Sequence, residues 1–515
     1  MSIPRLFLPD LLYRDGALRE GEGLAVDATG RIVDPAALPK DAEVLRLPRR
    51  ALFPGAVNAH SHAFQRLLRG RTEYVESGHA QDDFWSWREL MYRAAGALSP
   101  EEVYVASRQA FVEMARAGIT TVGEFHYLHH APDGTPYENR NELALQVLRA
   151  AKDVGLRIVL LRVGYARAGF ELPENPRQRR FIDPDAETFL RTVEALEAST
   201  RGDPLVSVGV APHSVRAVPV EWLREMVKAP SAHRGQETAP TGQGPHGQGN
   251  SNQGSQGQGN SDQGPRGQGN SGQGPHGQGN STQRSEKQGP VVHMHVSEQP
   301  AEIAACLREH GLRPVELLAR EGLLGPRFTA VHGIHLTEDE IRMLGAARAN
   351  VCACPSTERN LGDGVIPADL LLAAGAHVSL GSDSQAQIDW MEDARQLESH
   401  LRLVRLKRAV LDPGGGSPDG LARVLLDAAT VAGARSLGVD CGALVPGAPA
   451  DFFTLDLDHP SLAGGTSLGA CVFGAERSAI TEVAVQGNFI VREGQHRLER
   501  DSSQAFSALA QRIFT

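Results

Sequence analysis

Eight short apolar runs, separated by longer segments with helical spacing, constrain most strongly how this chain of 515 residues folds. The runs are rich in β-branched residues, and helical spacing occurs between most of them, for example in residues 143–148 and 221–226. Strands that alternate with helices form a parallel sheet, and eight such units close into a barrel. The sequence therefore predicts an α/β fold with a (β/α)8 barrel. The predicted strands are Leu52–Asn58, Thr120–Glu124, Arg157–Val163, Leu205–Val210, Val291–Val296, Phe328–Val331, Asn350–Cys354 and His377–Gly381.

Side chains with metal-binding atoms lie at or near the ends of four of these predicted strands. They are His60 and His62, His295, His332, and Asp383. Imidazole and carboxylate groups suit Zn²⁺, and a catalytic zinc keeps one coordination position for water. Such a metal lowers the pKa of its water to about 7 and so makes hydroxide available at neutral pH. Because barrel enzymes keep their chemistry at the C-terminal ends of the strands, these residues predict a metal-dependent hydrolase.

The placement of these motifs carries more information than the motifs themselves. A single His-x-His or Gly-Ser-Asp occurs by chance, whereas all of them fall at predicted strand ends. Other histidines are expected to have structural roles. His293 lies two residues before His295 and packs inside the barrel, while His129, His130 and His335 lie beyond strand ends.

Eight stretches of the chain, from about residue 50 to 390, resemble the amidohydrolase superfamily in sequence and in order. Within these stretches the amino-acid sequence is most similar to one group, the N-formimino-L-glutamate deiminases of histidine degradation. The stretches are Asn58–Arg66, Phe84–Arg93, Glu124–His130, Ala211–Val218, His295–Gln299, Val331–Leu336, Cys354–Gly364 and Gly381–Gln385. The chain departs from related sequences at Arg359, where no catalytic residue is affected.

The resemblance implies both metal ligands and catalytic residues. The implied ligands of one Zn²⁺ per chain, with Fe or Mn as other candidates, are His60, His62, His295 and Asp383. The implied catalytic residues are Glu298, His332 and Asp383. Glu298 takes a proton from the attacking water and passes it to the departing nitrogen, His332 holds or polarises the water, and Asp383 shares the proton transfer. Binuclear relatives bridge two metals with a lysine on the fourth strand; residues 205–214 contain none, which favours one metal.

The substrate that the resemblance implies is N-formimino-L-glutamate, a small dicarboxylate hydrolysed to N-formyl-L-glutamate and ammonia. Its two carboxylates call for arginine, whose planar fork binds a carboxylate through two hydrogen bonds. Arg88 and Arg216 are the expected partners, and Gln65, Tyr127 and His213 are the expected neutral ones. The alternative role for either arginine alone is a surface ion pair.

Composition argues against several classes of protein. Lys and Arg number 52 and Asp and Glu 62, so the net charge of −10 does not suggest nucleic acid or an anionic membrane as a partner. No apolar stretch approaches the roughly 20 residues that span a bilayer, and the first residues lack the pattern of a signal peptide. Five cysteines, an odd number without CxxC spacing, indicate reduced thiols and a cytoplasmic location. We expect a homodimer.

Both chain ends lie outside the barrel pattern. Residues 1–52 and 440–515 contain short strands with Asp-Gly, Thr-Gly and Gln-Gly turns, which favour antiparallel hairpins. By the resemblance, they form a composite β-sandwich beside a barrel of residues 53–439. An insert at residues 235–289 contains a Gly- and Gln-rich repeat of ten residues, from 242 to 283, without large apolar residues. It cannot bury a core, so we expect it to be disordered, on the barrel face opposite the active site.

Two other functions remain open. A deaminase that acts on a purine or related ring has the same metal site, but its pocket is expected to be aromatic without paired arginines. A non-catalytic barrel that serves as a binding protein is the more distant alternative. Glu298 argues against it, since a binding protein does not need a proton shuttle beside a metal.

Overall fold

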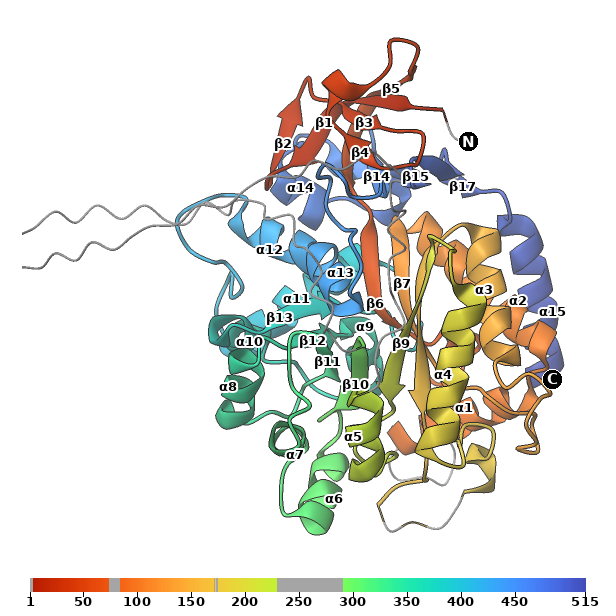
Figure 1. Cartoon of the computed structure of the whole chain (residues 1–515). Helices are drawn as coiled ribbons and strands as arrows, with labels where there is room; N and C mark the ends of the chain where they lie inside the picture. The colour runs from red at the N-terminus through yellow and green to blue at the C-terminus, as the bar shows by residue number, and fades with distance from the viewer. Residues whose placement is uncertain (1–2, 74–83, 171, 173–174, 229–289) are drawn as a thin grey trace, which may run out of the picture. The chain divides into compact units, whose positions relative to one another are not determined.

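The computed structural model describes residues 3–73, 84–170, 172, 175–228 and 290–515. Their strands form two sheets, one of eight strands and one of nine. The first is entirely parallel, and the second is mixed and combines segments from both ends of the chain (Figure 1). The predicted fold class, an α/β barrel with a smaller β domain built from the two termini, is confirmed. The insert predicted at residues 235–289 lies outside the described residues.

The barrel strands follow one another in chain order, and each pairs in parallel with the next. They are β6 (Ala56–Ser61), β7 (Ile119–His126), β8 (Arg157–Gly164), β9 (Val206–Pro212), β10 (Val292–Val296), β11 (Phe328–His332), β12 (Asn350–Ala353) and β13 (His377–Leu380). A bridge between Ser61 and Asp383 connects the first strand to the segment after the last, and the Asp383 N–H donates to the His60 carbonyl over 3.0 Å. The barrel is therefore closed by residues of the predicted metal site.

The first predicted strand, Leu52–Asn58, is divided between the two sheets. Residues 52–54 end β5 (Glu43–Pro54) in the mixed sheet, and β6 begins at Ala56. Gly55 makes this division possible, because a Cβ atom there would lie 2.2 Å from the Thr120 hydroxyl oxygen. The predicted run is correct in type, but the strand of the mixed sheet continues two residues beyond the expected boundary at 52.

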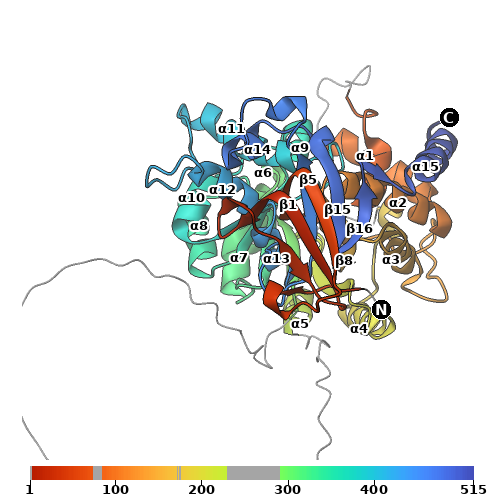
Figure 2. The same ribbon diagram turned by 90° about the horizontal axis from the view of Figure 1, so that it is seen from above.

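Helices surround the barrel (Figures 1 and 2). They are α1 (Phe84–Ala97), α2 (Pro100–Arg116), α3 (Glu142–Val154), α4 (Ala186–Thr200), α5 (Val220–Lys228), α6 (Pro300–His310), α7 (Pro314–Arg320), α8 (Glu338–Ala346), α9 (Pro355–Leu361), α10 (Ala368–Ala374), α11 (Trp390–Arg405), α12 (Gly420–Ala428) and α13 (Val431–Leu437). None of the helices in the described part of the chain is long and apolar enough to span a bilayer.

Helix α2 illustrates how local sequence sets a boundary and a buried face. The Ser99 hydroxyl accepts the Glu102 N–H, the Glu102 carboxylate accepts the Ser99 N–H over 2.9 Å, and Pro100 takes the first helical position. Phe111 and Met114, three residues apart, are fully buried. Burial of such a side chain contributes about 1.5–3 kcal/mol, so the inner face rather than helix propensity holds α2 in place.

The mixed sheet joins the two ends of the chain. Its other strands are β1 (Arg5–Arg14), β2 (Ala17–Glu20), β3 (Leu24–Val26), β4 (Ile32–Val33), β14 (Phe452–Asp456), β15 (Ile480–Val485), β16 (Asn488–Arg492) and β17 (Gln495–His496). β5 pairs with β14, and the predicted turn Gln486-Gly487 joins β15 to β16 with φ of 50° and 69°. The expectation of antiparallel hairpins is incomplete, because β1 and β5 pair in parallel.

Two helices accompany the C-terminal strands, α14 (Leu468–Phe473) and α15 (Glu499–Phe514). Helix α15 packs along α2 on the outside of the barrel (Figure 1). The Arg512 guanidinium forms an ion pair of 2.5 Å with Glu102, and the Arg66 guanidinium lies 5.1 Å from the centre of the Phe506 ring. The C-terminal residues therefore support the barrel wall next to β6 and β7.

Candidate active site

The four predicted metal ligands lie together at the C-terminal ends of three barrel strands. His60 is in β6 and His62 follows it, His295 is in β10, and Asp383 follows β13. Their ligand atoms all lie within 4.8 Å of one another, and all four residues are buried. The Nε2 atoms of His60 and His62 are 3.2 Å apart, and Asp383 Oδ1 lies 3.1 Å from His62 Nε2. The structure thus brings together residues that are up to 323 positions apart in the chain.

Hydrogen bonds on the far side of two rings determine which nitrogen faces this cluster. His62 Nδ1 donates to the Phe125 carbonyl over 2.9 Å, and His295 Nδ1 donates to the His213 carbonyl over 3.1 Å. A carbonyl oxygen only accepts, so Nδ1 carries the proton and Nε2 presents a lone pair. Lone pairs that converge beside a carboxylate suit a cation. The set of three imidazoles and one carboxylate fits Zn²⁺ or another divalent transition metal.

The protonation states of the cluster agree with this assignment. Burial lowers the pKa of His60 to about 3 and lowers the pKa of His295 well below its usual range. Burial by itself raises the pKa of Asp383, but its close contacts with the imidazoles of His60 and His62 hold it well below the ordinary value. At neutral pH His60 and His295 are therefore neutral imidazoles and Asp383 is an ionised carboxylate, the forms that bind a metal.

The three predicted catalytic residues lie beside one another. Glu298 sits in the bend between β10 and α6, and its Oε1 is 3.5 Å from Nε2 of His332, the last residue of β11. The same His332 nitrogen lies 3.9 Å from Asp383 Oδ2. Burial raises the pKa of Glu298. Burial alone lowers the pKa of His332, but the carboxylates around this ring outweigh the effect and raise its pKa well above 6.5. A raised carboxyl pKa suits a group that must both accept and donate a proton near neutral pH.

Three residues of the site have backbones in the left-handed region. The φ angles are 71° for His332, 45° for Asp383 and 55° for Ser297, which precedes Glu298. Such a conformation costs about 1–3 kcal/mol for a residue other than glycine and persists only where the surroundings enforce it. The fold therefore maintains strain at the strand ends that position the predicted chemistry.

Glu358 is a functional residue that the sequence reasoning missed. It lies on α9, is buried, and has its Oε1 3.4 Å from Nδ1 of His332. The same oxygen accepts the Cys354 N–H over 2.8 Å. Because a carboxylate on Nδ1 fixes the ring orientation, Glu358 directs the other nitrogen of His332 toward Glu298 and Asp383. Its presence in the stretch Cys354–Gly364, which carries the resemblance, was the available signal.

A pocket above the cluster is lined by all five predicted substrate-binding residues. The lining comprises His62, Gln65, Trp87, Arg88, Met91, Tyr92, Tyr127, Tyr165, Phe181, His213, Arg216, His295, Glu298, His332, Leu361 and Asp383. Gln65 Nε2 donates to the Tyr127 hydroxyl over 2.7 Å, and the His213 ring packs 5.0 Å from that of His295. One pocket therefore contains three of the four predicted metal ligands, the predicted proton shuttle and both arginines.

Arg216 presents a positive charge to this pocket without a matching carboxylate. Its Nε has no hydrogen-bond partner among the described residues, and none of their carboxylates forms an ion pair with its guanidinium. Burial lowers the pKa of Arg216, while the charges of Glu302 and Glu298 raise it, with a net rise. A buried cation of this kind is costly without an anion, which makes the pocket suitable for an anionic ligand.

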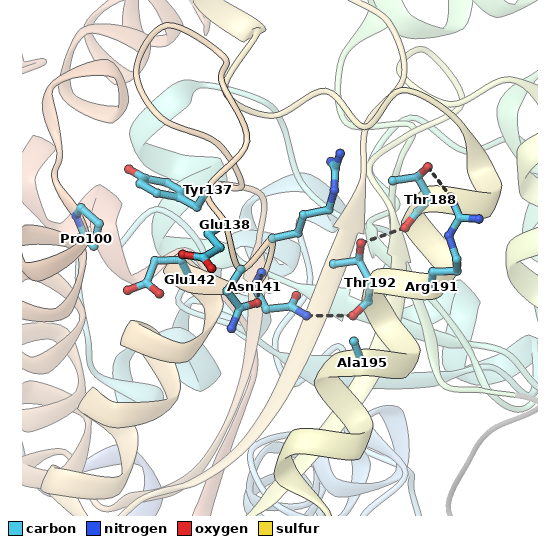
Figure 3. A pocket seen from close by; sticks show the side chains of 11 residues that line it. Pro100, Tyr137, Glu138, Asn141, Glu142, Thr188, Arg191, Thr192 and Ala195 are labelled. Atoms are coloured by element: carbon cyan, nitrogen blue, oxygen red, sulfur yellow. Dashed lines mark hydrogen bonds between the residues drawn. The ribbon is translucent and has the colours of Figure 1, made fainter.

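A second pocket lies outside the barrel, between the start of α3 and α4 (Figure 3). The polar side chains that line this pocket largely form hydrogen bonds with other residues of its lining. Asn141 Nδ2 donates to the Thr192 carbonyl over 2.9 Å, and Arg191 donates to the Thr188 hydroxyl over 3.1 Å. The residues that line it include none of the predicted ligands or catalytic groups, so the chemistry belongs to the pocket at the strand ends.

Comparisons with known proteins agree with the geometry. The chain matches the sequence family described as "Amidohydrolase family" over residues 51–236 and 280–490. It is 34% identical to a formimidoylglutamate deiminase of Pseudomonas aeruginosa over 88% of each chain, and 28% identical to an 8-oxoguanine deaminase of the same species over 88% of this chain and 86% of that protein. The crystal structure of an amidohydrolase from Brucella melitensis superposes with a TM-score of 0.80 and 31% identity, covering 99% of this chain and 100% of that one. The chain belongs to the amidohydrolase family.

Proposed function

We propose that this amidohydrolase is a deiminase that hydrolyses N-formimino-L-glutamate to N-formyl-L-glutamate and ammonia, a step of histidine degradation. Water adds to the formimino carbon, the bond from this carbon to the terminal nitrogen breaks, and that nitrogen leaves as ammonia. The relative that is 34% identical carries this activity in its name. The unpaired charge of Arg216, in a pocket that also contains Arg88 and Glu298, is the observation that carries the proposal.

The two arginines match the charge of the substrate. Arg88 comes from α1, and Arg216 comes from the segment after β9, so the two cations reach the pocket from different elements. A dicarboxylate has two anionic groups, and each guanidinium forms a bidentate pair with one of them. The formimino carbon at the other end of the substrate then faces Glu298 and His332.

His60, His62, His295 and Asp383 would hold one divalent metal ion, with Zn²⁺ the best match to the donor set. Such an ion, when bound, supplies Lewis-acid chemistry and lowers the pKa of a coordinated water to about 7. Glu298 accepts a proton from the attacking water and delivers it to the departing nitrogen. His332, oriented by Glu358, holds the water at the position where Glu298 reaches it.

Ammonia release from a panel of substrates tests the proposal. The purified protein is loaded with Zn²⁺, and formiminoglutamate, 8-oxoguanine, adenosine and cytosine are offered separately. We expect release from formiminoglutamate at a kcat/KM at least 100-fold above that for any ring substrate. Turnover of a ring compound without turnover of formiminoglutamate refutes the proposal while retaining a hydrolytic metal site.

A ring deaminase is the second candidate, because the pocket also has an aromatic wall. Tyr127, Phe181 and Tyr165 line it, with the Phe181 ring centred 5.2 Å from that of Tyr127. An 8-oxoguanine deaminase is also among the relatives. A neutral purine gives the Arg216 cation no anion to pair with, and this favours the dicarboxylate over a ring substrate. The homodimer, the cytoplasmic location and the absence of a nucleic-acid or membrane partner stay predictions.

A further inference from the structure

Two tyrosines that the sequence reasoning did not predict line the pocket next to the arginines. Tyr92 is on α1, one turn after Arg88, and Tyr165 follows β8 directly. The Arg88 guanidinium carbon lies 5.4 Å from the centre of the Tyr92 ring. Burial raises the pKa of both phenols, so both keep their protons at neutral pH and remain hydrogen-bond donors.

Gln178 contacts both hydroxyl groups from behind the pocket lining. Its side chain is fully buried, and its Nε2 donates to the Tyr92 hydroxyl over 2.6 Å and to the Tyr165 hydroxyl over 2.8 Å. An amide NH2 group only donates, so each phenol oxygen acts as an acceptor toward Gln178. Neither phenol proton is therefore used by Gln178. The two phenols also bond to each other, with Tyr165 as the donor, so the Tyr92 proton is left for a ligand in the pocket.

The segment that carries Gln178 is tied to the helix that carries Arg88 and Tyr92. Arg180 donates to the carbonyls of Ala95 and Leu98 at the end of α1 and, over 2.8 Å, to the His130 carbonyl. Asp183, also fully buried, forms an ion pair of 3.1 Å with Arg162 on β8, the strand that Tyr165 follows. Gln178 is thus fixed to both elements that present the phenols.

A carboxylate has room for these donors beside an arginine. Its two oxygens offer about four lone-pair positions, of which a guanidinium fork fills two. Two positions remain, and the phenols held by Gln178 have at least one proton to offer them. We propose that Tyr92 and Tyr165 complete a carboxylate site with Arg88, and that Gln178 is the positioning residue that turns their hydroxyl protons toward the bound carboxylate. This inference rests on the proposed dicarboxylate substrate.

Binding of glutarate, measured by calorimetry on the metal-loaded enzyme, tests the carboxylate site without requiring turnover. The variants are Tyr92→Phe, Tyr165→Phe and Gln178→Glu, with Gln396→Met as the control at a buried glutamine of α11 outside the pocket. Loss of a hydrogen bond to a charged group weakens binding roughly 10- to 150-fold. We expect a loss of this size in the dissociation constant of glutarate for each phenylalanine variant and no change for the control.

Gln178→Glu separates positioning from packing. A carboxylate at 178 only accepts hydrogen bonds, so it draws both phenol protons away from the pocket while it preserves the shape of the side chain. We expect glutarate binding to weaken at least as much as in the phenylalanine variants, and the KM for formiminoglutamate to rise by the same factor with kcat within about threefold, because only uniform binding is lost. Gln178→Met, which neither orients nor attracts the protons, is expected to fall between wild type and Gln178→Glu.

The outcomes distinguish this inference from the proposed function. Unchanged glutarate binding in all four variants at positions 92, 165 and 178, or no binding by the wild type, overturns the carboxylate site. Weakened binding in the variants of an enzyme that does not hydrolyse formiminoglutamate supports the carboxylate site and refutes the proposed reaction. A fall in kcat alone, with constant KM and constant glutarate affinity, assigns these residues to fold maintenance and also overturns the inference.

Discussion

Replacing Arg216 by methionine is the sharpest test of charge recognition in the pocket. Methionine keeps most of the length of the side chain but removes the cation and its fork. Because Arg216 has no ion-pair partner among the described residues, the substitution breaks no salt bridge of the folded protein. The loss is therefore expected in substrate binding rather than in folding.

The expected size follows from the burial of this guanidinium. Truncation of one partner of a buried, hydrogen-bonded charge pair costs about 2–5 kcal/mol. At about 1.4 kcal/mol for each factor of ten, the KM for formiminoglutamate rises roughly 30- to 4,000-fold. The charge of Arg216 also opposes the rise that burial causes in the pKa of Glu298. Its removal therefore raises this pKa further, and the acidic limb of the kcat profile moves to higher pH.

Steady-state kinetics of three variants measure these effects. Arg216→Lys keeps the charge without the fork and is expected to lie between wild type and Arg216→Met. Arg224→Met is the matched control, because Arg224 is half exposed on α5 and pairs with Glu321 over 2.6 Å. A KM for Arg216→Met within threefold of the control, with an unshifted pH profile, shows that no substrate anion meets Arg216 and refutes the dicarboxylate assignment.

Four further changes probe other parts of the molecule. Glu298→Gln is expected to retain metal, measured by elemental analysis, while kcat falls roughly 10²- to 10⁴-fold, and an undiminished rate assigns the proton shuttle to another group. His295→Ala is expected to lose metal and activity together; full metal content in this variant contradicts the ligand set. Arg162→Met leaves the buried Asp183 carboxylate without its partner, so chemical denaturation is expected to show a loss of about 3–5 kcal/mol in unfolding free energy. Deletion of residues 242–283 is expected to preserve kcat/KM within about twofold, since the described chain leaves α5 and re-enters β10 at the strand end opposite His295; a folded but inactive deletion protein contradicts this.

The barrel was predictable because its signal is local and repeated. Each strand is a short β-branched run such as Arg157–Val163, and the structure places strands at all eight runs. Only the run Leu52–Asn58 was wrongly predicted as one strand, because it contains the end of β5 and the start of β6. The division depends on the close approach of Gly55 to Thr120, 65 residues later in the chain, and hydrophobic periodicity does not report such a contact.

The metal cluster was predictable for a different reason. Its residues are histidines and an aspartate, whose side chains at strand ends are suited to metal binding. The carboxyl ends of barrel strands meet at one face, so these side chains are expected to lie close together. His60, His62, His295 and Asp383 could therefore be grouped before any distance was known. The same logic also places His293 correctly, since it lies deeper in β10 and binds the Ser436 carbonyl over 2.9 Å.

Residues that act through other residues were not predictable in this way. Gln178 lies in a segment without periodicity, and its importance depends on two phenols that approach it from α1 and from the end of β8. Glu358 acts on His332 across a contact between α9 and β11. A glutamine or a glutamate is common on any surface, so only the folded arrangement distinguishes these two from solvent-exposed neighbours.

Closure of the barrel and formation of the site are the same structural event. Asp383, an implied metal ligand, takes part in the bridge that joins the last strand to the first, and the carbonyl of His60, another ligand, accepts its N–H. Because Asp383 holds a left-handed backbone conformation at a cost of about 1–3 kcal/mol, the contacts of the closed barrel must maintain it. Neither ligand reaches its position in a barrel whose first and last strands are apart. A metal that binds all four residues therefore favours the closed barrel. It stabilises the sheet between β6 and β13, the first and last strands, which are not consecutive in the chain.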